Sequence, residues 1–468
     1  MGFWRTKPLG DGSHAENSLP KTLSWPHLIA LGIGAIIGMG IFTLTGIGAH
    51  LAGPGVILSF ALAGIVCALA ALAYAEVATL IPASGSAYTY TYTALGELIA
   101  WSVGWSLILE YSLSCSAVAT GWSAHMAGLL QSWGVHLSPA LLAGPMEGGI
   151  INLPAVFIVA VITGLLLIGA RESALVNIVL VIIKLTALGA FIVIALPAVK
   201  AGNYHPFMPM GFLSHEVDGQ KVGVMAAAAI MFFAFYGFDA VSTSAEETKN
   251  PGRDLTIGII GSMLICTVFY MVVGACVVGV LPYTEVAKSN GEPLPYILRL
   301  MQHPFVADLV GIAAVLALPS VLLVFMFGQS RILFVMARDG LIPKSLSKLD
   351  KRGLPSLMTL LVGLFIAVFA GLVPLQQITE MANTGTLVAF IAVSLALMIL
   401  RIKRPDLPRK FKAPLWWLIA PLAIAGCLFL FTSLNVSTML YFLYWNIAGV
   451  VIYWIFGFWN SKLRKGEA

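Results

Sequence analysis

The stretch Leu31-Gly32-Ile33-Gly34-Ala35-Ile36-Ile37-Gly38-Met39-Gly40-Ile41-Phe42 lies in the middle of the first long apolar run of the chain. Each of its glycines costs up to about 1 kcal/mol relative to alanine inside a helix. A backbone group released from a helix within hydrocarbon also needs a new partner. The stretch therefore predicts a helix that unwinds near the middle of a membrane, where freed amides and carbonyls bind a small charged solute. Close helix packing through Gly34 and Gly38, four residues apart, is the alternative explanation.

The composition is that of a membrane protein. The chain of 468 residues is 59% hydrophobic and 10% charged, whereas soluble domains carry about 25% charged residues. Apolar stretches long enough to cross a bilayer recur along the whole length. The sequence therefore predicts an all-α integral membrane protein with no soluble domain of useful size. We predict twelve spans, at about 27–48, 55–82, 97–128, 152–170, 174–198, 223–245, 256–282, 306–335, 355–373, 380–401, 413–434 and 438–460.

A second interruption falls in the sixth predicted span, within Met231-Phe232-Phe233-Ala234-Phe235-Tyr236-Gly237-Phe238-Asp239-Ala240-Val241-Ser242-Thr243. Spans one and six occupy corresponding positions if the chain holds two five-helix repeats of opposite topology. Paired interruptions at such positions indicate a binding site at the membrane midplane. The predicted organisation is a leading segment, two repeats, two further helices and a tail, at 1–26, 27–198, 223–401, 413–460 and 461–468.

The positions of lysine and arginine predict the orientation. Placing both termini in the cytoplasm also places most of the 26 basic residues there, including dense clusters at 331–352 and 401–412. The first span has no cleavage site and is expected to be retained. This asymmetry explains the net charge of +5, so we expect no nucleic acid partner. The five cysteines show no metal-ligand spacing and are expected to be packing residues.

Four ionisable side chains lie inside predicted spans: Glu76, Glu110, Lys184 and Asp239. Each costs about 2.5–3.5 kcal/mol at the centre of a bilayer, so each needs a reason to be there. We expect Glu76 to be structural, as an acceptor of hydrogen bonds. Glu110 is expected to pair with a cation, accept a proton or brace a neighbouring helix. Asp239 follows the break at Gly237, where it either braces loose backbone amides or contacts a solute.

Lys184 lies about ten residues into the fifth predicted span, too deep for its ammonium to reach the membrane surface. Burial favours loss of the proton from such a lysine, which makes it a candidate proton carrier. An ammonium can also stand where a sodium ion stands in a related transporter. A permanently charged structural ammonium is the alternative. Ser320 and Ser330 are candidate hydroxyl partners for Lys184.

The interrupted spans and several further motifs resemble the amino acid–polyamine–organocation superfamily over nearly the whole chain. Within it, the chain looks most like bacterial relatives of the cationic amino acid transporters. The matching motifs, in order, are Gly34 to Phe42, Tyr74-Ala75-Glu76 with Pro82 to Tyr90, Leu109-Glu110-Tyr111 with Val118-Ala119 and Trp122-Ser123, Gly237 to Thr243 with Glu246 to Leu255, and Gly328-Gln329-Ser330-Arg331 with Met336 to Pro343.

The resemblance implies a LeuT-type fold of two inverted five-helix repeats with two added C-terminal helices, and alternating-access transport of L-amino acids. Two departures stand out: animal cationic transporters have fourteen spans, and Met39 stands where the family often has Ser or Thr. Amides near Gly38, Met39 and Gly40 are expected to bind the substrate carboxylate at a positive helix end. Carbonyls near the breaks are expected to accept from its ammonium. The residues for this second role are Ile36, Phe233 and Tyr236, and Ala234 is a further expected substrate-binding residue.

A separate pocket is expected to hold the substrate side chain, with Cys115, Phe238 and Met326 as candidates. Phe233 resembles the family's aromatic gate over the substrate, with plain packing as the alternative. Asp239 and Glu76 are the expected supports of this site. Lys184, Glu110 and Ser320 are the candidates for proton coupling.

The sequence thus predicts a proton-coupled symporter for a broad range of L-amino acids, including cationic ones. A proton-independent uniporter or exchanger is the main alternative. A channel is more remote because no polar stripe repeats along the spans, and no catalytic constellation indicates an enzyme. We expect no cofactor other than coupling protons, and membrane lipids as partners; a small membrane subunit is left open. The expected location is the bacterial inner membrane, with both termini cytoplasmic.

Overall fold

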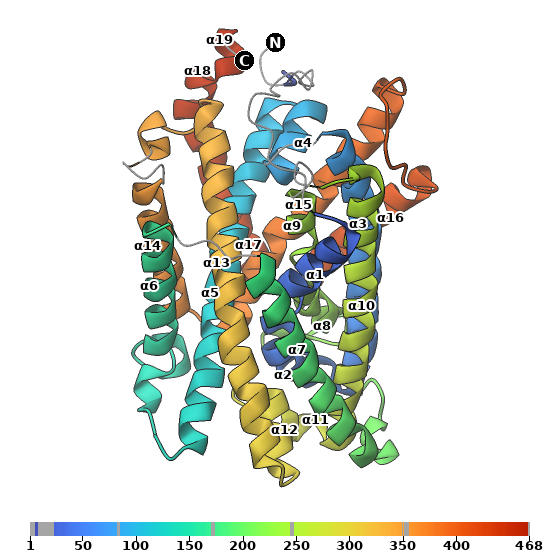
Figure 1. Cartoon of the computed structure of the whole chain (residues 1–468), viewed down its shortest axis with the longest axis vertical. Helices are drawn as coiled ribbons and strands as arrows, with labels where there is room; N and C mark the ends of the chain where they lie inside the picture. The colour runs from blue at the N-terminus through green and yellow to red at the C-terminus, as the bar shows by residue number, and fades with distance from the viewer. Residues whose placement is uncertain are drawn as a thin grey trace.

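The computed structural model describes residues 5–7, 23–81, 85–169, 174–243, 248–348, 350 and 355–466. Long helices run along the long axis of the molecule and surround shorter helical pieces at its centre (Figure 1). Within the described ranges, seven helical segments are long and apolar enough to cross a membrane, and five shorter apolar helices accompany them. The chain therefore has the helical architecture of a membrane protein. Whether all twelve of these segments cross the membrane stays a prediction.

The helices are α1 (Trp25–Ile36), α2 (Thr45–Ala52), α3 (Val56–Leu80), α4 (Ser86–Ala94), α5 (Glu97–Ser132), α6 (Leu153–Leu167), α7 (Ala174–Ala195), α8 (Val224–Met231), α9 (Phe238–Thr243), α10 (Pro251–Val280), α11 (Tyr283–Val286), α12 (Pro293–Leu300), α13 (Pro304–Arg338), α14 (Ser356–Leu372), α15 (Leu375–Lys403), α16 (Trp416–Thr432), α17 (Val436–Ile452), α18 (Phe458–Asn460) and α19 (Lys462–Lys465). One antiparallel hairpin, of β1 (His215–Val217) and β2 (Gln220–Val222), departs from the expected all-helical fold. It pairs His215 with Val222.

Both interruptions expected from the sequence are present. Helix α1 ends at Ile36, residues 37–38 are not helical, and a π-helical turn over Gly40–Leu44 leads into α2. Helix α8 ends at Met231 and continues as a 3-10 turn over Phe232–Phe235. Tyr236 is then extended, and Gly237 takes a φ of 107°, which only glycine adopts readily. We call these two places the first and the second break.

The structure also contains elements that the hydropathy pattern missed. Helix α4 lies between α3 and α5, and its sequence of tyrosines, threonines and alanines has no long apolar run. Helix α15 begins at Leu375, several residues before the expected start at 380. Its first turns include Glu380, which is buried because Asn435 and Thr438 donate hydrogen bonds to its carboxylate. Polar residues with buried partners therefore lowered the hydropathy of segments that are helical and buried.

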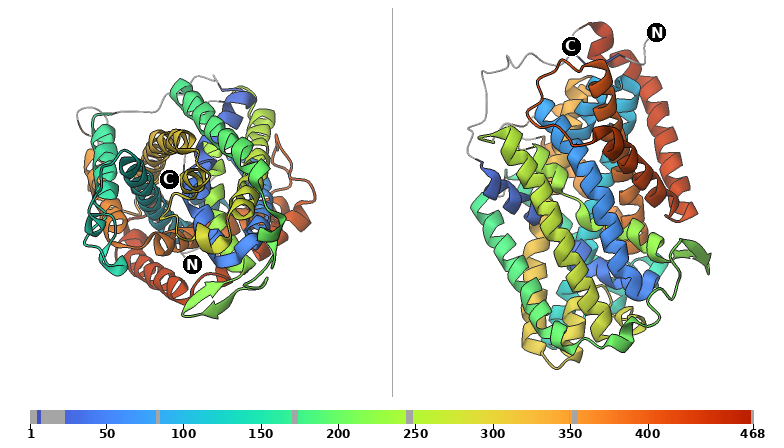
Figure 2. Two further views of the ribbon diagram at one scale, coloured as in Figure 1. Left: turned by 90° about the horizontal axis from the view of Figure 1, so that it is seen from below. Right: turned by 90° about the vertical axis from the view of Figure 1, so that its right-hand side faces the viewer.

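The N-terminal and C-terminal segments meet at one end of the molecule, which we call the terminal end (Figures 1 and 2). Lys7 Nζ and Tyr88 Oη both donate hydrogen bonds to the Asp339 carboxylate, at 2.8 and 2.9 Å. The backbone amide of Lys462, at the start of α19, donates to the Asp339 carbonyl. From this end α1 leads inward to the first break, packed against α10 and α7. Helix α5 packs along α13 and α15 on the other side of the core.

Candidate functional site

The two breaks lie directly against each other. A Cβ atom on Gly40 would lie 2.3 Å from Ala234 Cα, and a Cβ on Gly237 would lie 2.6 Å from Ala35 Cβ. Since real Cβ atoms do not approach other atoms so closely, both glycines are needed for this backbone contact. Gly34 has a different role, because its Cβ would meet Asn177 Oδ1 of α7 at 2.4 Å. Close packing and unwinding therefore both occur, at different glycines of one segment.

Tyr270 of α10 joins the two breaks. Its hydroxyl lies 2.7 Å from the Ile36 carbonyl oxygen and 2.8 Å from the Ala234 carbonyl oxygen. A phenol has a single proton to donate, so it serves one carbonyl at a time. The side chain is fully buried. The sequence analysis missed Tyr270; its one signal is a lone hydroxyl-bearing aromatic residue in an apolar span.

Lys184 of α7 holds α1 just before the first break. Its side chain is completely buried, and Nζ donates to the Gly34 carbonyl oxygen at 2.7 Å. The two serines proposed as its partners both donate to their own helix: Ser320 Oγ to Ala317 and Ser330 Oγ to Phe327. Their hydroxyl oxygens can still accept a hydrogen bond. Lys184 thus connects α7 to α1 through a backbone carbonyl that lies just before the first break.

A cavity lies beside the breaks, with about 370 Å³ of unfilled space, part of it open to the surroundings. It lies between α1, α7, the second break and α13. Among the described residues, its wall contains no ionisable side chain, and its polar side chains are Asn177 and Ser320. Because the α1 residues that line it precede the first break, the cavity lies on the terminal side of the breaks. The lining residues are Leu31, Gly34, Ala35, Asn177, Gly237, Ser320, Val321, Val324 and Phe325.

The other side of the second break is packed. Phe233 is buried, and its ring lies over that of Tyr236 with centroids 4.8 Å apart. The Tyr236 hydroxyl donates to Asn383 Oδ1 of α15, and Asn383 Nδ2 donates to the Ala229 carbonyl at 2.6 Å. Asn383 therefore fixes both the break and the helix before it. The sequence analysis considered only ionisable residues inside spans, so this neutral amide was missed.

Further from the terminal end, an ion pair fixes α12 against α5. Arg299 Nη1 lies 2.5 Å from Glu292 Oε1, and Arg299 Nη2 donates to the Gly128 carbonyl of α5 at 3.3 Å. Burial raises the pKa of the Glu292 carboxyl, an effect that the neighbouring guanidinium opposes. A Cβ on Gly128 would lie 2.0 Å from Glu292 Oε2, so the carboxylate rests directly on the helix backbone. This side is held by close contacts, whereas the terminal side of the breaks has the cavity.

The residues expected to form a side-chain pocket lie elsewhere in the packing. Phe238 is fully buried against the rings of Tyr74 and Phe390, at 5.6 and 5.0 Å. Cys115 Sγ faces the Leu322 carbonyl oxygen at 4.0 Å, and Met326 is buried. Met39 packs on Gly121 of α5, where a Cβ would lie 2.6 Å from its Cγ. The walls of the cavity come instead from the α13 face of Val321, Val324 and Phe325.

Two acids of the predicted site, Asp239 and Glu110, lie outside the cavity wall. Tyr111 Oη donates to Asp239 Oδ2 at 3.2 Å, and the Tyr111 ring meets Phe325 of the cavity wall edge-on at 5.6 Å. Glu110 is buried, and its Oε2 has no hydrogen-bond partner among the described residues. Asp239 thus supports the second break through a tyrosine. The orphaned oxygen of Glu110 is consistent with any of the three roles considered for it.

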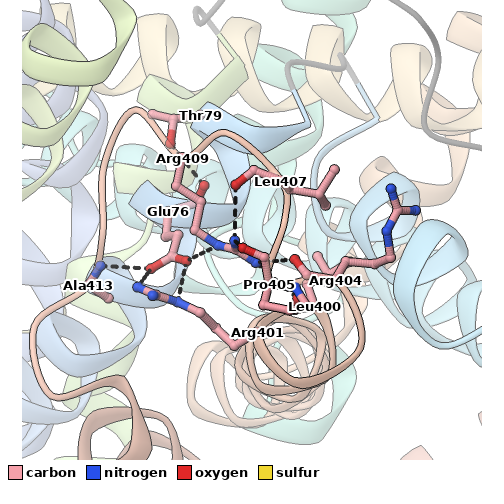
Figure 3. A network of polar contacts seen from close by, with 9 residues as sticks. All are labelled: Glu76, Thr79, Leu400, Arg401, Arg404, Pro405, Leu407, Arg409 and Ala413. Carbon is pink, nitrogen blue, oxygen red and sulfur yellow. Dashed lines mark hydrogen bonds and ion pairs between the residues drawn. The ribbon is translucent and has the colours of Figure 1, made fainter.

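Glu76 belongs to a separate network shown in Figure 3. Arg401 Nη2 and Arg409 Nε donate to its carboxylate at 2.7 and 3.0 Å, and the Ala413 backbone amide donates at 2.7 Å. The carboxylate is buried and joins α3 to the end of α15 and the chain that follows. These contacts are those of a support and give Glu76 no part in the cavity.

The described ranges bring together no group of three or more His, Cys, Asp or Glu side chains able to hold a metal ion. All five cysteines are free and buried. What the site offers is backbone: carbonyls and amides at two breaks, beside a neutral cavity. The last carbonyls of α1 have no hydrogen-bond partner within that helix. After the first break, the Phe42 amide donates to the Gly38 carbonyl at 3.4 Å. The amides of Gly38, Met39 and Gly40 come before this bond, in the break and the first turn after it.

Comparison with known proteins identifies the chain's relatives. Residues 23–457 match the model of the amino acid permease family. The chain is 46% identical to the branched-chain amino acid permease BcaP of Bacillus subtilis (strain 168), over 99% of both chains. It is 40% identical to the methylthioribose transporter of the same organism, again over 99% of both. It is also 38% identical to the vacuolar cationic amino acid transporter 2 of Arabidopsis thaliana, over 85% of this chain and 62% of the relative.

Proposed function

Because the chain belongs to the amino acid permease family of the amino acid–polyamine–organocation superfamily, we propose that it is a secondary active L-amino acid transporter that works by alternating access. It is a transporter related to the cationic amino acid transporters and not an enzyme. The fold we propose is the LeuT type, with two inverted five-helix repeats and two added helices. The seven long and five shorter apolar helices supply the twelve segments that such a fold needs. The two breaks directly follow the first and the sixth of these segments.

The contact between the two breaks is the observation that carries this proposal. A zwitterionic amino acid presents a carboxylate and an ammonium at a fixed distance. The amides of Gly38, Met39 and Gly40 lie at a positive helix end suited to the carboxylate. The carbonyl of Ile36 has a second lone pair besides the one that meets Tyr270 and is suited to the ammonium. Such contacts recognise what all amino acids share.

The walls of the cavity support a preference among side chains. Valine, leucine and phenylalanine side chains dominate the lining, and none of its described residues is a carboxylate. We propose a broad substrate range in which neutral aliphatic side chains bind best and cationic ones are accepted. One relative is named a branched-chain amino acid permease and another a cationic amino acid transporter, and the proposed range includes both classes.

Proton coupling is proposed to act through Lys184. When protonated, its ammonium makes a charged hydrogen bond to Gly34 and holds α1 against α7. When neutral, it makes a weaker bond, which favours movement of α1. A coupled proton shifts the equilibrium between states only if it binds them with different affinity, and this bond supplies the difference. We place the protein in the bacterial cell membrane, with the terminal end in the cytoplasm.

The test is uptake of radiolabelled leucine and arginine into proteoliposomes, at external pH of about 5.5 and about 7.5, on either side of neutrality. We expect competition by both aliphatic and cationic amino acids, and accumulation driven by an inward proton gradient. Lys184→Ala and Lys184→Arg are expected to bind substrate without accumulating it, since a guanidinium does not lose its proton in this range. Lys200→Ala, an exposed lysine, is the matched control.

Three results would contradict parts of this proposal. Uptake by the unmodified protein that ignores a proton gradient would indicate a uniporter or exchanger. Wild-type pH dependence in Lys184→Ala would show that another group carries the proton, and Glu110 would be tested next. Rejection of all neutral amino acids would refute the broad range. Single-channel currents across a bilayer would refute a carrier mechanism altogether.

A further inference from the structure

Three residues on one face of α7 approach the first break: Asn177, Val181 and Lys184. Their spacing of four and three residues places them in one row along a helix. All three meet Gly34: a Cβ there would lie 2.4 Å from Asn177 Oδ1 and 3.0 Å from Val181 Cγ2, and Lys184 Nζ bonds to its carbonyl at 2.7 Å. Helical side chains lean toward the helix N-terminus, so the Lys184 side chain points along this row toward Asn177.

Lys184 is completely buried, whereas Asn177 is partly exposed and lines the cavity. The distances through Gly34 limit the separation of Lys184 Nζ and Asn177 Oδ1 to about 9 Å or less, a distance that a short chain of water molecules can bridge. The described part of the cavity wall has two polar side chains, Asn177 and Ser320. The proton of Ser320 Oγ is directed to the Ala317 carbonyl. Asn177 is therefore the wall residue best placed to both donate to and accept from water.

We propose that Asn177 is a positioning residue for proton release, holding the water that receives the proton of Lys184 on the terminal side. This inference rests on the proposed coupling role of Lys184. In the step, one N–H bond of the ammonium breaks and its electron pair stays on Nζ, giving a neutral amine. A new O–H bond forms on water, and the resulting hydronium passes its proton to further water in the cavity. The amide of Asn177 orders the water through Oδ1 and Nδ2 and keeps its own protons.

Two other titratable groups near Lys184, both among the described residues, do not offer an equal route. Cys266 of α10 lies near Lys184, but it is fully buried. Tyr270, four residues further along α10, is also fully buried and bonds to the Ile36 and Ala234 carbonyls. Neither lines the cavity. On the described part of α1 and α13, the residues facing the cavity carry no charge.

The test separates net transport from exchange in proteoliposomes. Net uptake requires Lys184 to release its proton in every cycle, whereas exchange of internal for external leucine returns the carrier loaded and proceeds without release. Asn177→Leu keeps the size of the side chain and removes its polarity. We expect proton-driven net uptake and the accompanying proton flux to fall about tenfold, the effect of losing one well-held water. Because Asn177 lines the cavity, both rates are compared at saturating leucine, and we expect the rate of exchange to fall much less than net uptake.

Matched variants identify the cause. Asn177→Ser restores a group that donates and accepts, and we expect it to recover most of the net uptake. Thr186→Val removes a hydroxyl from the exposed face of the same helix and is expected to change neither rate. Slowing of net uptake in D2O is expected to be larger in Asn177→Leu than in the unmodified protein. If Asn177→Leu does not fold, as judged by thermal unfolding in detergent, Asn177→Ala takes its place.

The outcomes distinguish this inference from the function on which it rests. Equal loss of net uptake and exchange in a folded Asn177 variant would overturn it, because the residue would then act in the conformational cycle. Unchanged net uptake in Asn177→Leu would also overturn it, while Lys184→Ala measured in parallel would still report on coupling. Proton-driven uptake that survives Lys184→Ala would remove the coupling proposal itself, whatever Asn177 does.

Discussion

Replacing Gly40 by alanine tests the contact between the two breaks. The added methyl would lie 2.3 Å from Ala234 Cα, 2.4 Å from Ala234 Cβ and 3.2 Å from its amide nitrogen. Two of these atoms are backbone, in a 3-10 turn whose end is tied to α15 through Asn383 and Tyr236. The neighbour therefore cannot turn away as a flexible side chain would, and the two breaks must separate.

Overpacking of this kind costs about 1–3 kcal/mol. Because about 1.4 kcal/mol is a tenfold change in an equilibrium constant, the packed arrangement of the breaks would be populated several-fold to more than a hundredfold less. We expect Gly40→Ala to unfold at lower temperature in detergent, to gain little stability from added leucine, and to lose uptake. The measurements are thermal unfolding with and without leucine, and uptake into proteoliposomes.

Gly38→Ala is the matched control, since the nearest atom to its added Cβ is Val321 Cγ2 at an ordinary 3.5 Å. Its φ lies outside the left-handed region, and alanine at a compatible glycine adds about 0.4–1 kcal/mol of stability. We expect its unfolding temperature to be kept or raised, with weaker binding of large side chains because Val321 lines the cavity. Valine or leucine at Gly38 should block uptake. Equal behaviour of the two alanine variants would refute this account of the breaks.

Two further substitutions test the contacts around the breaks and the network in Figure 3. Tyr270→Phe removes the hydroxyl that joins both breaks and is expected to cost about 0.5–1.5 kcal/mol and to weaken substrate binding. Tyr204→Phe, which loses a bond to a single carbonyl, should affect stability alone; equal loss of binding in both would argue against Tyr270 as a brace. Glu76→Gln leaves two arginines without their buried counter-charge and is expected to cost about 3–5 kcal/mol in thermal unfolding. Glu285→Gln, in an exposed ion pair, should change nothing measurable, and a Glu76→Gln protein as stable as this control would show that the network is not a support.

The breaks were predictable because their cause is local. Repeated glycines in an apolar run, and Gly237 beside aromatic residues, disfavour a continuous helix whatever surrounds them. The deep burial of Lys184 was likewise predictable from its position within an apolar span. Tyr270 and Asn383 were not found, because nothing local distinguishes a neutral polar residue that braces a break from one that bonds to its own helix. Their roles depend on which carbonyls the fold places opposite them.

The side-chain pocket could not be predicted for a different physical reason. Helix phase is read from the contrast between polar and apolar faces, and α13 is apolar all round over the residues concerned. Met326 and Val324 are equally plausible on sequence alone, although only Val324 lines the cavity. The same lack of contrast applies to Phe238, whose ring is buried among aromatic side chains. The residues that line the cavity therefore required the tertiary structure.

The segment before the first break is held at two neighbouring carbonyls by two chemically different donors. Tyr270 of α10 reaches the Ile36 carbonyl, and Lys184 of α7 reaches the Gly34 carbonyl. A tyrosine keeps its proton over the whole physiological range, so its bond is constant. A hydrogen bond from a charged donor contributes about 1.5–3 kcal/mol and a neutral one about 0.5–1.5 kcal/mol. Loss of the lysine proton would thus weaken the Lys184 hydrogen bond by about 1–2 kcal/mol and leave the Tyr270 bond intact. The equilibrium between the positions of α1 relative to α7 would then shift roughly 5- to 30-fold, while the two breaks stay joined.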